Sequence, residues 1–234
     1  MSKSKAPHTL LDLDPAFSSG KPSGRTRSKS APVDKLMIEH ELQAKGCRYI
    51  CGVDEVGRGP LAGPVVCAAV IMPLDEGSII QGIDDSKKLT ERRRYILAEQ
   101  IRSRAVCFRI GIKSPQDIDR LNILEATKLA MKEAIESLPI QPDFVITDGN
   151  MTLDISLPQR YVIKGDAGSY TIGAASILAK TYRDDLMTKL SSKYPEYNFA
   201  QNKGYPSKEH IQAILDHGLC PEHRRSFTSK WAAD

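Results

Sequence analysis

The sequence lacks an apolar run long enough to cross a membrane, and its first residues lack the apolar core of a secretory signal. Its five cysteines are odd in number and scattered, which does not suit a disulfide framework. Cys47 and Cys51 are close in sequence, but no second pair of ligands has the spacing of a zinc site. We therefore expect a cytoplasmic protein with reduced thiols and no membrane segment.

A strong excess of charge is also missing from most of the chain. The net charge of +4 comes from 33 basic and 29 acidic residues, and six basic against three acidic residues place +3 of it in residues 1–34. The other 27 basic and 26 acidic residues give +1, so bulk charge does not argue for nucleic-acid binding. Residues 1–34, rich in Ser, Lys, Pro and Gly, are expected to form a disordered basic tail. A solvated tail is favoured slightly over a salt-sensitive tether to nucleic acid.

The length of 234 residues allows one sizeable α/β domain with a small appendage. Apolar runs and alternation predict strands near residues 49–53, 65–72, 105–112, 144–147 and 161–163. Capping residues and helical spacing predict helices at 33–44, 90–104, 114–139, 169–190 and 207–217. We assign residues 35–192 to the main domain, and residues 193–234 to a C-terminal helical extension.

The most informative stretch separates the first two predicted strands. Asp54 and Glu55 are expected where the first strand leaves the sheet, and a Gly57-Arg58-Gly59 loop follows them. An isolated Asp-Glu pair more often faces water in a turn, because a buried carboxylate needs a cation or hydrogen-bond donors. The loop changes this balance, since its glycines let backbone amides approach an anion and the arginine offers a planar fork to a phosphate. The combination favours a hard cation beside a phosphate, as in phosphodiester chemistry.

Two further predicted strands end in an acid, Asp148 and Asp166. Neighbouring strands are about 5 Å apart, so acids at adjacent strand ends can converge on two cations, as a two-metal phosphodiesterase requires. Taken singly, each of these acids would more often belong to an Asp-Gly turn or cap a helix. The turn interpretation is retained for Asp84 and Asp85.

Seven sequence blocks resemble the type 2 ribonucleases H, and the bacterial ribonuclease HII branch in particular. They occur in the order of that family and cover nearly everything after residue 45: GVDEVGRGPLAGPVV, DSKKL, NILEATKLAM, TDGN, KGDAGSYTIGAASILAKTYRD, KGYPSKEH and CPEHRRSF. The resemblance implies a ribonuclease H-like α/β fold with a central mixed five-stranded sheet flanked by helices, and a C-terminal extension that completes the substrate site.

The same resemblance implies a metal-dependent endoribonuclease. It would cut the RNA strand of RNA–DNA hybrids and single ribonucleotides in duplex DNA, leaving 3′-hydroxyl and 5′-phosphate ends. It would use Mg²⁺ or Mn²⁺, with two ions during catalysis, and would serve ribonucleotide removal and primer processing. No obligate protein partner is evident, and a monomer is expected.

The four acidic positions of the family match Asp54, Glu55, Asp148 and Asp166, as catalytic and metal-binding residues. Asp54 and Asp148 are the expected shared ligands, whereas Asp166 has the alternative of capping the next helix. Adjacent residues on a regular strand point to opposite faces, so Asp54 and Glu55 reach one metal only if the strand ends there or Glu55 uses its carbonyl.

Recognition of the ribose 2′-hydroxyl, which distinguishes RNA from DNA, is implied for the Gly57, Arg58 and Gly59 loop and for Tyr205. The tyrosine ring would stack on the neighbouring deoxyribose; its alternative is a half-buried packing role. The family more usually has glycine and threonine where this chain has Pro206 and Ser207. Lys87, Lys88, Lys180 and Lys203 are candidate phosphate contacts, although each singly would more often be solvated.

His210, His217 and His223 are expected on helix surfaces or in turns, because a metal-activated water needs no histidine base. Two rival functions stay open. One is another ribonuclease H-like nuclease, either a resolvase or a ribonuclease HIII, although the latter would have a large N-terminal binding domain. The other is a non-catalytic hybrid-binding protein, against which the clustered acids argue, since they repel phosphates.

Overall fold

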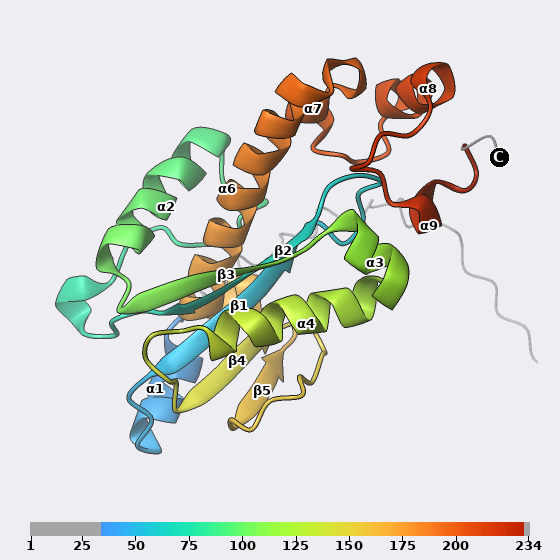
Figure 1. Ribbon diagram of the computed structural model, residues 1–234. Helices are drawn as coiled ribbons and strands as arrows, with labels where there is room; N and C mark the ends of the chain where they lie inside the picture. Colours follow the sequence, from blue (N-terminus) through green and yellow to red (C-terminus); the bar gives the residue numbers. More distant parts are fainter. Residues whose placement is uncertain (1–33, 232–234) are drawn as a thin grey trace, which may run out of the picture. The chain divides into compact units, whose positions relative to one another are not determined.

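The computed structural model describes residues 34–231, and its centre is a mixed five-stranded sheet (Figure 1). The strand order is β3-β2-β1-β4-β5, in which β1 pairs antiparallel with β2 and parallel with β4. The β2–β3 pair is antiparallel and the β4–β5 pair is parallel. The strands are β1 (Ile50–Val56), β2 (Val65–Ile71), β3 (Cys107–Lys113), β4 (Phe144–Asp148) and β5 (Gln159–Val162). The predicted five-stranded α/β architecture is confirmed.

The helices begin where the sequence offers capping groups. Thr90, Ser114, Ser169 and Ser207 each accept a hydrogen bond from a backbone N–H in the first turn of the helix that follows. The α-helices are α1 (Met37–Ala44), α2 (Glu91–Arg104), α3 (Pro115–Leu121), α4 (Ile123–Glu136), α5 (Gly165–Gly168), α6 (Tyr170–Lys193), α7 (Phe199–Asn202), α8 (Lys208–His217) and α9 (Arg225–Thr228). Short 3-10 helices occupy Glu76–Ser78 and Pro195–Tyr197.

The single helix predicted from Ser114 to about residue 139 is divided in two. Asn122 has a φ of 68°, which ends α3, and its side-chain oxygen accepts hydrogen bonds from the backbone N–H groups of Leu124 and Glu125. This residue therefore starts α4 in a new direction. The break was missed because asparagine is tolerated in helices as well as in left-handed turns.

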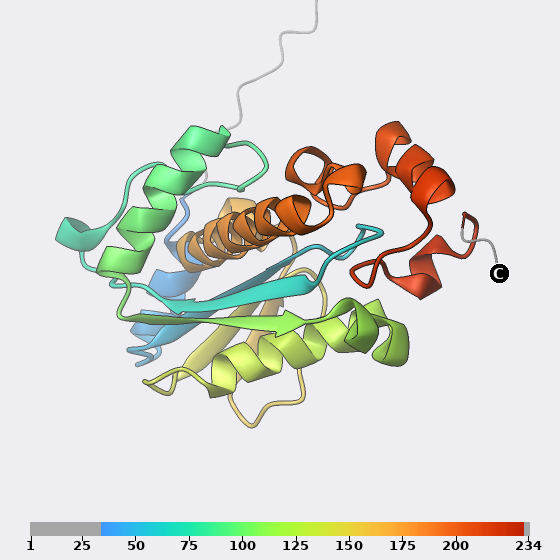
Figure 2. The same ribbon diagram turned by 45° about the horizontal axis from the view of Figure 1, so that its top comes forward.

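The helices cover the sheet on both faces (Figures 1 and 2). On one face, α4 packs its Ala130, Met131 and Ile135 against apolar residues of β1, β2 and β4. On the other face, α2 and α6 enclose a second apolar cluster with β2. Gly52 of β1 allows close contact with α6, because a Cβ there would lie 2.3 Å from the Thr171 carbonyl carbon. The sheet is thus a buried core layer, and its chemistry is confined to strand ends.

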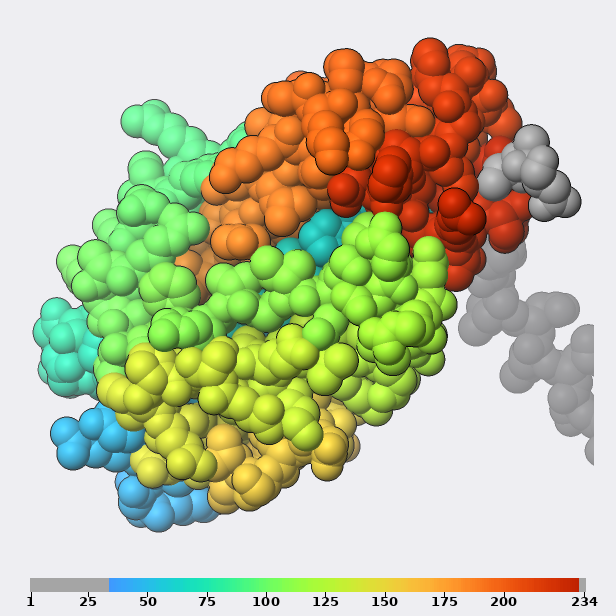
Figure 3. Space-filling view, viewed as in Figure 1, coloured from blue at the N-terminus to red at the C-terminus, as the bar shows by residue number. Residues whose placement is uncertain are grey.

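The C-terminal residues form a separate apolar cluster on the second half of α6. Tyr197, Phe199 and Ile214 pack there with Met187 of α6 and with Leu61 from the loop between β1 and β2. Figure 3 shows the C-terminal segment (orange to red) beside the segment of helices α3 and α4 (green) on one face. The division at residue 193 stays a prediction, and the predicted tail lies outside the described residues except for Asp34.

Two further expectations can be compared with the described residues. No helix between residues 34 and 231 is long and apolar enough to cross a membrane. All five cysteines are free thiols, and three of them are buried in strands of the sheet: Cys51, Cys67 and Cys107.

Candidate active site

The register of the sheet brings acids of two strands to the same end. Val53 lies opposite Thr147, which is the last paired position between β1 and β4. Asp148 is the next residue of β4 and also its last. β1 continues through Asp54 and Glu55, paired only with β2. The expectation that β1 ends before these acids was therefore wrong: it is β4 that stops, and this leaves space beside the acids of β1.

The carboxylates of Asp54, Glu55 and Asp166 each interact electrostatically with the Asp148 carboxylate. Burial, then the charges of Glu55 and Asp148, raise the pKa of Asp54 well above its usual range. Burial also raises the pKa of Glu55, which Arg58 opposes and Asp148 reinforces. The pKa of Asp166 is raised by burial and then by Asp148. The four predicted acids thus form one electrostatic cluster with more negative charge than its surroundings neutralise.

The turn after β5 places Asp166 in this cluster. The N–H of Gly165 donates to Asp148 Oδ1 over 2.6 Å, which ties the turn to the end of β4. A Cβ at Gly165 would lie 2.6 Å from Ile172 Cδ1, so any side chain there would require Ile172 to shift. The cap of α6 is Ser169, which accepts from the N–H of Ile172, and not Asp166. Asp166 is 7% exposed and remains available to a ligand.

Ser176 is a member of the site that the sequence interpretation did not single out. Its side chain is close enough to Asp54 to lower the pKa of that carboxyl against the larger effect of burial. Its hydroxyl also lies 2.9 Å from that of Ser86. Ser176 comes from a stretch of small residues in α6, and this stretch lies in one of the family blocks.

The residues fit a hard divalent cation. All four predicted ligands offer carboxylate oxygens, the donors that Mg²⁺ and Mn²⁺ prefer. Oε2 of Glu55 is buried without a hydrogen-bond partner, so one ligand atom is already desolvated. Within residues 34–231, no three His, Cys, Asp or Glu side chains are gathered closely enough to hold a metal ion by themselves. Asp54, Glu55, Asp148 and Asp166 would therefore hold a cation only in an open site, where it would offset the repulsion between their negative charges.

The four candidate lysines differ in their surroundings. Lys87 Nζ lies 3.8 Å from Asp166 Oδ2, and although burial opposes its charge, the neighbouring acids raise its pKa. Lys88 approaches Asp84 instead, at 3.8 Å. Lys180 is paired with Asp184 at 2.7 Å, and Lys203 donates to Thr188 Oγ1 at 3.0 Å. The structure brings only Lys87 to the acids, and the phosphate contacts of all four lysines remain predictions.

The Gly57-Arg58-Gly59 loop lies against two buried arginines that the sequence interpretation missed. Gly57 has a φ of 93°, and a Cβ there would lie 2.3 Å from Arg183 Nε and 2.8 Å from the Pro64 carbonyl oxygen. Arg224 donates to the carbonyl oxygens of Gly57 and Arg58 over 2.6 and 3.0 Å. The only sequence signal for these arginines was their place in two of the family blocks.

The two arginines have no carboxylate partner among the described residues, and both are fully buried. Arg224 also donates to the Gly63 carbonyl, and Arg183 donates to the carbonyls of Ala62, Pro64 and Lys203. Burial lowers the pKa of Arg183 to about 10 and that of Arg224 to about 9. The loop therefore packs against two buried guanidinium groups whose hydrogen bonds all go to backbone carbonyl oxygens.

Tyr205 comes to the same loop from the C-terminal extension. The backbone N–H of Leu61 donates to the Gly204 carbonyl over 2.8 Å, and a Cβ at Gly59 would lie 3.8 Å from the Tyr205 ring. The Arg183 guanidinium carbon lies 6.0 Å from the ring centroid. Tyr205 is 42% exposed, so its ring is open to a ligand beside Gly59.

Glu39, from helix α1, holds the start of α6 from the side opposite the loop. It is fully buried, and its Oε1 accepts from Ser169 Oγ at 2.6 Å and from the Thr171 N–H and Oγ1 at 2.9 Å. The Tyr170 N–H donates to the Lys35 carbonyl at 2.8 Å. This contact fixes the residues that directly follow Asp166. A single glutamate in a short amphipathic helix gave no sequence signal of its burial.

We expect Glu39→Ala to destabilise the protein by about 3 kcal/mol, because it leaves buried donors of Ser169 and Thr171 without an acceptor. Glu39→Gln retains an acceptor oxygen and should cost less. The measurement is urea unfolding followed by circular dichroism. Glu41→Ala, on the exposed side of the same helix, is the matched control and should leave the unfolding midpoint nearly unchanged. Equal midpoints for Glu39→Ala and Glu41→Ala would contradict the role of Glu39 as the buried acceptor for Ser169 and Thr171.

The expectation of helix surfaces or turns holds for two of the three histidines. His217 is exposed at the end of α8, and His223 lies at a turn, where its N–H donates to the Cys220 carbonyl over 3.0 Å. His210 lies on a helix but is fully buried, and His223 is only 3% exposed. Their rings contact each other and the aromatic rings of Tyr197 and Phe199. The polar character of histidine hides such burial in the sequence.

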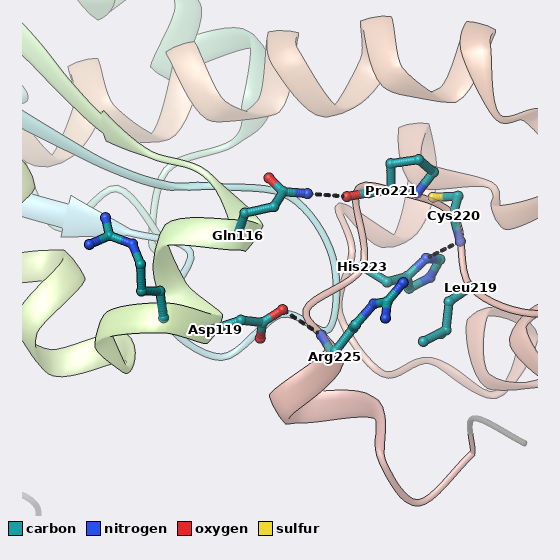
Figure 4. A pocket seen from close by; sticks show the side chains of 8 residues that line it. Gln116, Asp119, Leu219, Cys220, Pro221, His223 and Arg225 are labelled. Carbon is teal, nitrogen blue, oxygen red and sulfur yellow. Dashed lines mark hydrogen bonds between the residues drawn. The ribbon is translucent and has the colours of Figure 1, made fainter. Parts of the chain in front are cut away.

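A pocket of about 600 Å³ lies between α3 and the C-terminal segment (Figure 4). The Gln116 side chain donates to the Pro221 carbonyl, and the Asp119 carboxylate accepts from the Arg225 N–H. These two hydrogen bonds join the walls of the pocket. His223 also lines it. None of the predicted acids or loop residues does, so this pocket is distinct from the acid cluster.

Comparison with known proteins gives one consistent family. The family model of ribonuclease HII matches residues 51–231. A ribonuclease HII of Caldicellulosiruptor saccharolyticus is 52% identical over 190 residues, which are 81% of this chain and 92% of that protein. One of Pelodictyon phaeoclathratiforme is 48% identical over 76% of this chain and 88% of that protein.

Solved structures agree in fold. The crystal structure of ribonuclease H2 from Pyrococcus horikoshii matches with a TM-score of 0.66 and 28% identity, over 76% of this chain and 93% of that chain. Archaeoglobus fulgidus ribonuclease HII, solved in complex with PCNA, matches with a TM-score of 0.65 and 26% identity, over 76% of this chain and 94% of that one. The predicted ribonuclease H-like fold is confirmed, and the chain belongs to the ribonuclease HII family of endoribonucleases.

Proposed function

We propose that this protein cleaves the RNA strand of RNA–DNA hybrids and also cuts duplex DNA at a single embedded ribonucleotide, leaving 3′-hydroxyl and 5′-phosphate ends. Membership of the ribonuclease HII family supports the activity on hybrids. The finer proposal rests on two sets of residues. The acids at the ends of β1 and β4 form one cluster with Asp166, and Tyr205 lies beside the Gly57–Gly59 loop. The first suits phosphodiester hydrolysis, and the second suits recognition of one ribose.

The acids would work with Mg²⁺ or Mn²⁺, two ions during catalysis, with Asp54 and Asp148 as shared ligands. When bound, the ions would supply an activated water and would stabilise the leaving oxygen. The chain's own residues orient the substrate. Amides and Arg58 of the loop would bind the phosphate next to the ribose, and Lys87 would contact a phosphate near Asp166. These contacts hold the scissile bond against the acids.

Tyr205 would read the junction between RNA and DNA. Its exposed ring lies beside Gly59, where it can stack on the deoxyribose that follows a ribonucleotide while its hydroxyl approaches the ribose 2′-hydroxyl. The extension of residues 193–234 would thus complete the substrate site. The nucleic acid is the only partner that this proposal requires, with the protein acting as a monomer in the cytoplasm, in ribonucleotide removal and primer processing.

The direct test uses a labelled DNA duplex with one ribonucleotide and a long RNA–DNA hybrid, each with Mg²⁺, Mn²⁺ or a chelator. Cleavage of both substrates with either metal, and of neither with the chelator, is expected. The cut in the first duplex should fall on the 5′ side of the ribonucleotide, so that the 5′-phosphate remains on it. Cleavage of the hybrid alone would overturn the single-ribonucleotide activity, and activity in the chelator would overturn the metal requirement.

Tyr205→Ala should lower kcat/KM for the single-ribonucleotide duplex by about 10- to 100-fold, because one stacking contact contributes about 1–3 kcal/mol. The long hybrid offers ribose on both sides of the cut and should lose less. Tyr205→Phe keeps the ring and should retain most of the activity on both. Equal loss on the two substrates would contradict the junction-reading role.

A further inference from the structure

The buried histidines connect Tyr205 to the segment that precedes Arg224. His210 Nδ1 lies 2.9 Å from the Tyr205 carbonyl oxygen, and the Nε2 atoms of His210 and His223 are 3.1 Å apart. At the other end, the Cys220 N–H donates to His223 Nδ1 over 3.0 Å, the contact drawn in Figure 4. Four groups thus form one continuous chain of hydrogen bonds.

The two ends of this chain dictate where every proton lies. A carbonyl oxygen only accepts, so His210 carries its proton on Nδ1 and donates it to Tyr205. A backbone N–H only donates, so His223 Nδ1 is without a proton and His223 carries its proton on Nε2. That proton is then donated to His210 Nε2. Both imidazoles are neutral, each in a single tautomer. A proton added to His210 would face the His223 N–H across 3.1 Å, and one added to His223 would face the Cys220 N–H across 3.0 Å.

The surroundings maintain the neutral state. The rings pack against Tyr197 and Phe199, and the Tyr197 hydroxyl donates its hydrogen bond to the Gly218 carbonyl. Burial lowers the pKa of His210, and burial together with His210 lowers the pKa of His223 to about 4. The pair is therefore uncharged at neutral pH, and it does not add to the positive charge of the arginines nearby.

His223 also belongs to the segment that holds the loop. It forms a β-bridge with Ala62, and the N–H of its neighbour Arg224 donates to the Leu61 carbonyl over 2.8 Å. The side chain of Arg224 holds the carbonyls of Gly57 and Arg58. One short segment therefore anchors the loop through Arg224 and the backbone of Tyr205 through the histidines.

We propose that His210 and His223 are positioning residues for substrate discrimination: their hydrogen-bond chain fixes Tyr205 at a set distance from the Gly57–Gly59 loop. The proposal rests on the role of Tyr205 given under the proposed function. Loss of the chain leaves the acids in place and removes one of the two donors to the Tyr205 carbonyl, the other being the Ser207 N–H at 2.8 Å. The tyrosine then shifts relative to the loop, so the single-ribonucleotide duplex is affected and the long hybrid much less.

Two substitutions of His210 separate this role from simple packing. Asparagine places its amide nitrogen near the position of Nδ1 and can still donate to the Tyr205 carbonyl, whereas glutamine places its amide near Nε2 and loses that contact. Glutamine is closer to histidine in volume, so packing alone predicts the opposite order. We expect H210N to keep the ratio of kcat/KM values for the two substrates within about 3-fold, and H210Q to lower it about 10-fold or more. His217→Gln, on the exposed end of the same helix, is the control and should leave the ratio unchanged.

A double-mutant cycle with Tyr205→Ala tests the route of the effect. If His210 acts through Tyr205, H210Q should cause no further loss of the ratio in the Tyr205→Ala background. An additive loss, or equal ratios for H210N and H210Q, would overturn the proposal. A Tyr205→Ala variant with an unchanged ratio would instead overturn the junction-reading role itself, which keeps the two failures distinct.

Nitrogen-15 NMR of the wild-type histidines gives a readout that needs neither activity nor a variant. We expect His210 with its proton on Nδ1 and His223 with its proton on Nε2 at pH 7. A charged ring or the reverse tautomer at either position would overturn the hydrogen-bond chain. This measurement tests the hydrogen-bond chain even if H210Q does not fold.

Discussion

Asp54→Asn is expected to abolish cleavage of both substrates, by about 1,000-fold or more in kcat/KM, while the affinity for an RNA–DNA hybrid changes little. Asp54 lies at the centre of the acid cluster, where its charge and those of Glu55 and Asp148 act on one another. An amide in its place removes the negative charge that attracts a divalent cation, and a metal centre contributes several kcal/mol to phosphodiester hydrolysis. The loop, Tyr205 and the lysines, which are proposed to contact the nucleic acid, remain unchanged.

The same substitution should make the metal-free protein more stable. Because the pKa of Asp54 is raised in the folded state, the folded protein binds its proton more tightly than the unfolded chain. The free energy of unfolding therefore falls as the pH rises from the ordinary aspartate pKa toward the raised one, and the full cost is present above the raised pKa. Asn removes that cost. In a chelator, its melting temperature should therefore exceed that of the wild type, and the difference should grow as the pH rises.

Differential scanning fluorimetry between pH 5 and 8, with chelator or with Mg²⁺, checks both parts of this expectation. Mg²⁺ should stabilise the wild type and have a smaller effect on Asp54→Asn. Asp154→Asn is the matched control, since Asp154 is fully exposed beside Lys132 and outside the acid cluster. Retained cleavage by Asp54→Asn, or a lower melting temperature in the chelator, would contradict the assignment of Asp54.

The sequence predicted the elements that local chemistry determines. Thr90, Ser114, Ser169 and Ser207 start helices because their side chains bond to the first turn, and this requires only three or four consecutive residues. Strands β2 and β4 followed from short apolar runs. The end of β1 was misjudged, because Asp54 and Glu55 are polar residues that a neighbouring strand nevertheless pairs.

The convergence of the acids was not derivable from local pattern alone. It depends on Val53 lying opposite Thr147, a register between residues 94 positions apart that no short segment encodes. For this reason Asp148 and Asp166, taken singly, looked like ordinary turn residues, and only the resemblance to a family joined them to Asp54.

Buried polar residues were the main omission. Glu39, Arg183, Arg224 and the two histidines belong to types that are usually exposed, so sequence pattern places them at the surface. For Glu39 and the two arginines, the hydrogen-bond partners are distant in the chain, as with Gly57, which lies 167 positions before Arg224. These residues also surround the site, and the side chains hardest to place from sequence are therefore the ones that hold its loops.

Arg224→Lys is expected to combine the largest loss of stability with a loss of activity on both substrates. The guanidinium of Arg224 reaches three carbonyl oxygens, those of Gly57, Arg58 and Gly63, from one planar group. An ammonium has a single nitrogen, so it cannot span these acceptors, and buried carbonyls lose their donors. We expect a loss of about 3–5 kcal/mol, which lowers the melting temperature by about 10 °C in a domain of this size.

Activity should also fall in the fraction that remains folded, because the carbonyls of Gly57 and Arg58 set the direction of the amides that follow them. Assays at a temperature well below the lowered midpoint separate this effect from unfolding. Arg225→Lys is the matched control: it makes the same chemical change at the next residue, whose side chain is exposed. If Arg224→Lys is unstable but fully active when folded, the arginine holds the fold and not the loop. If it behaves like Arg225→Lys in both assays, the buried hydrogen bonds contribute nothing measurable.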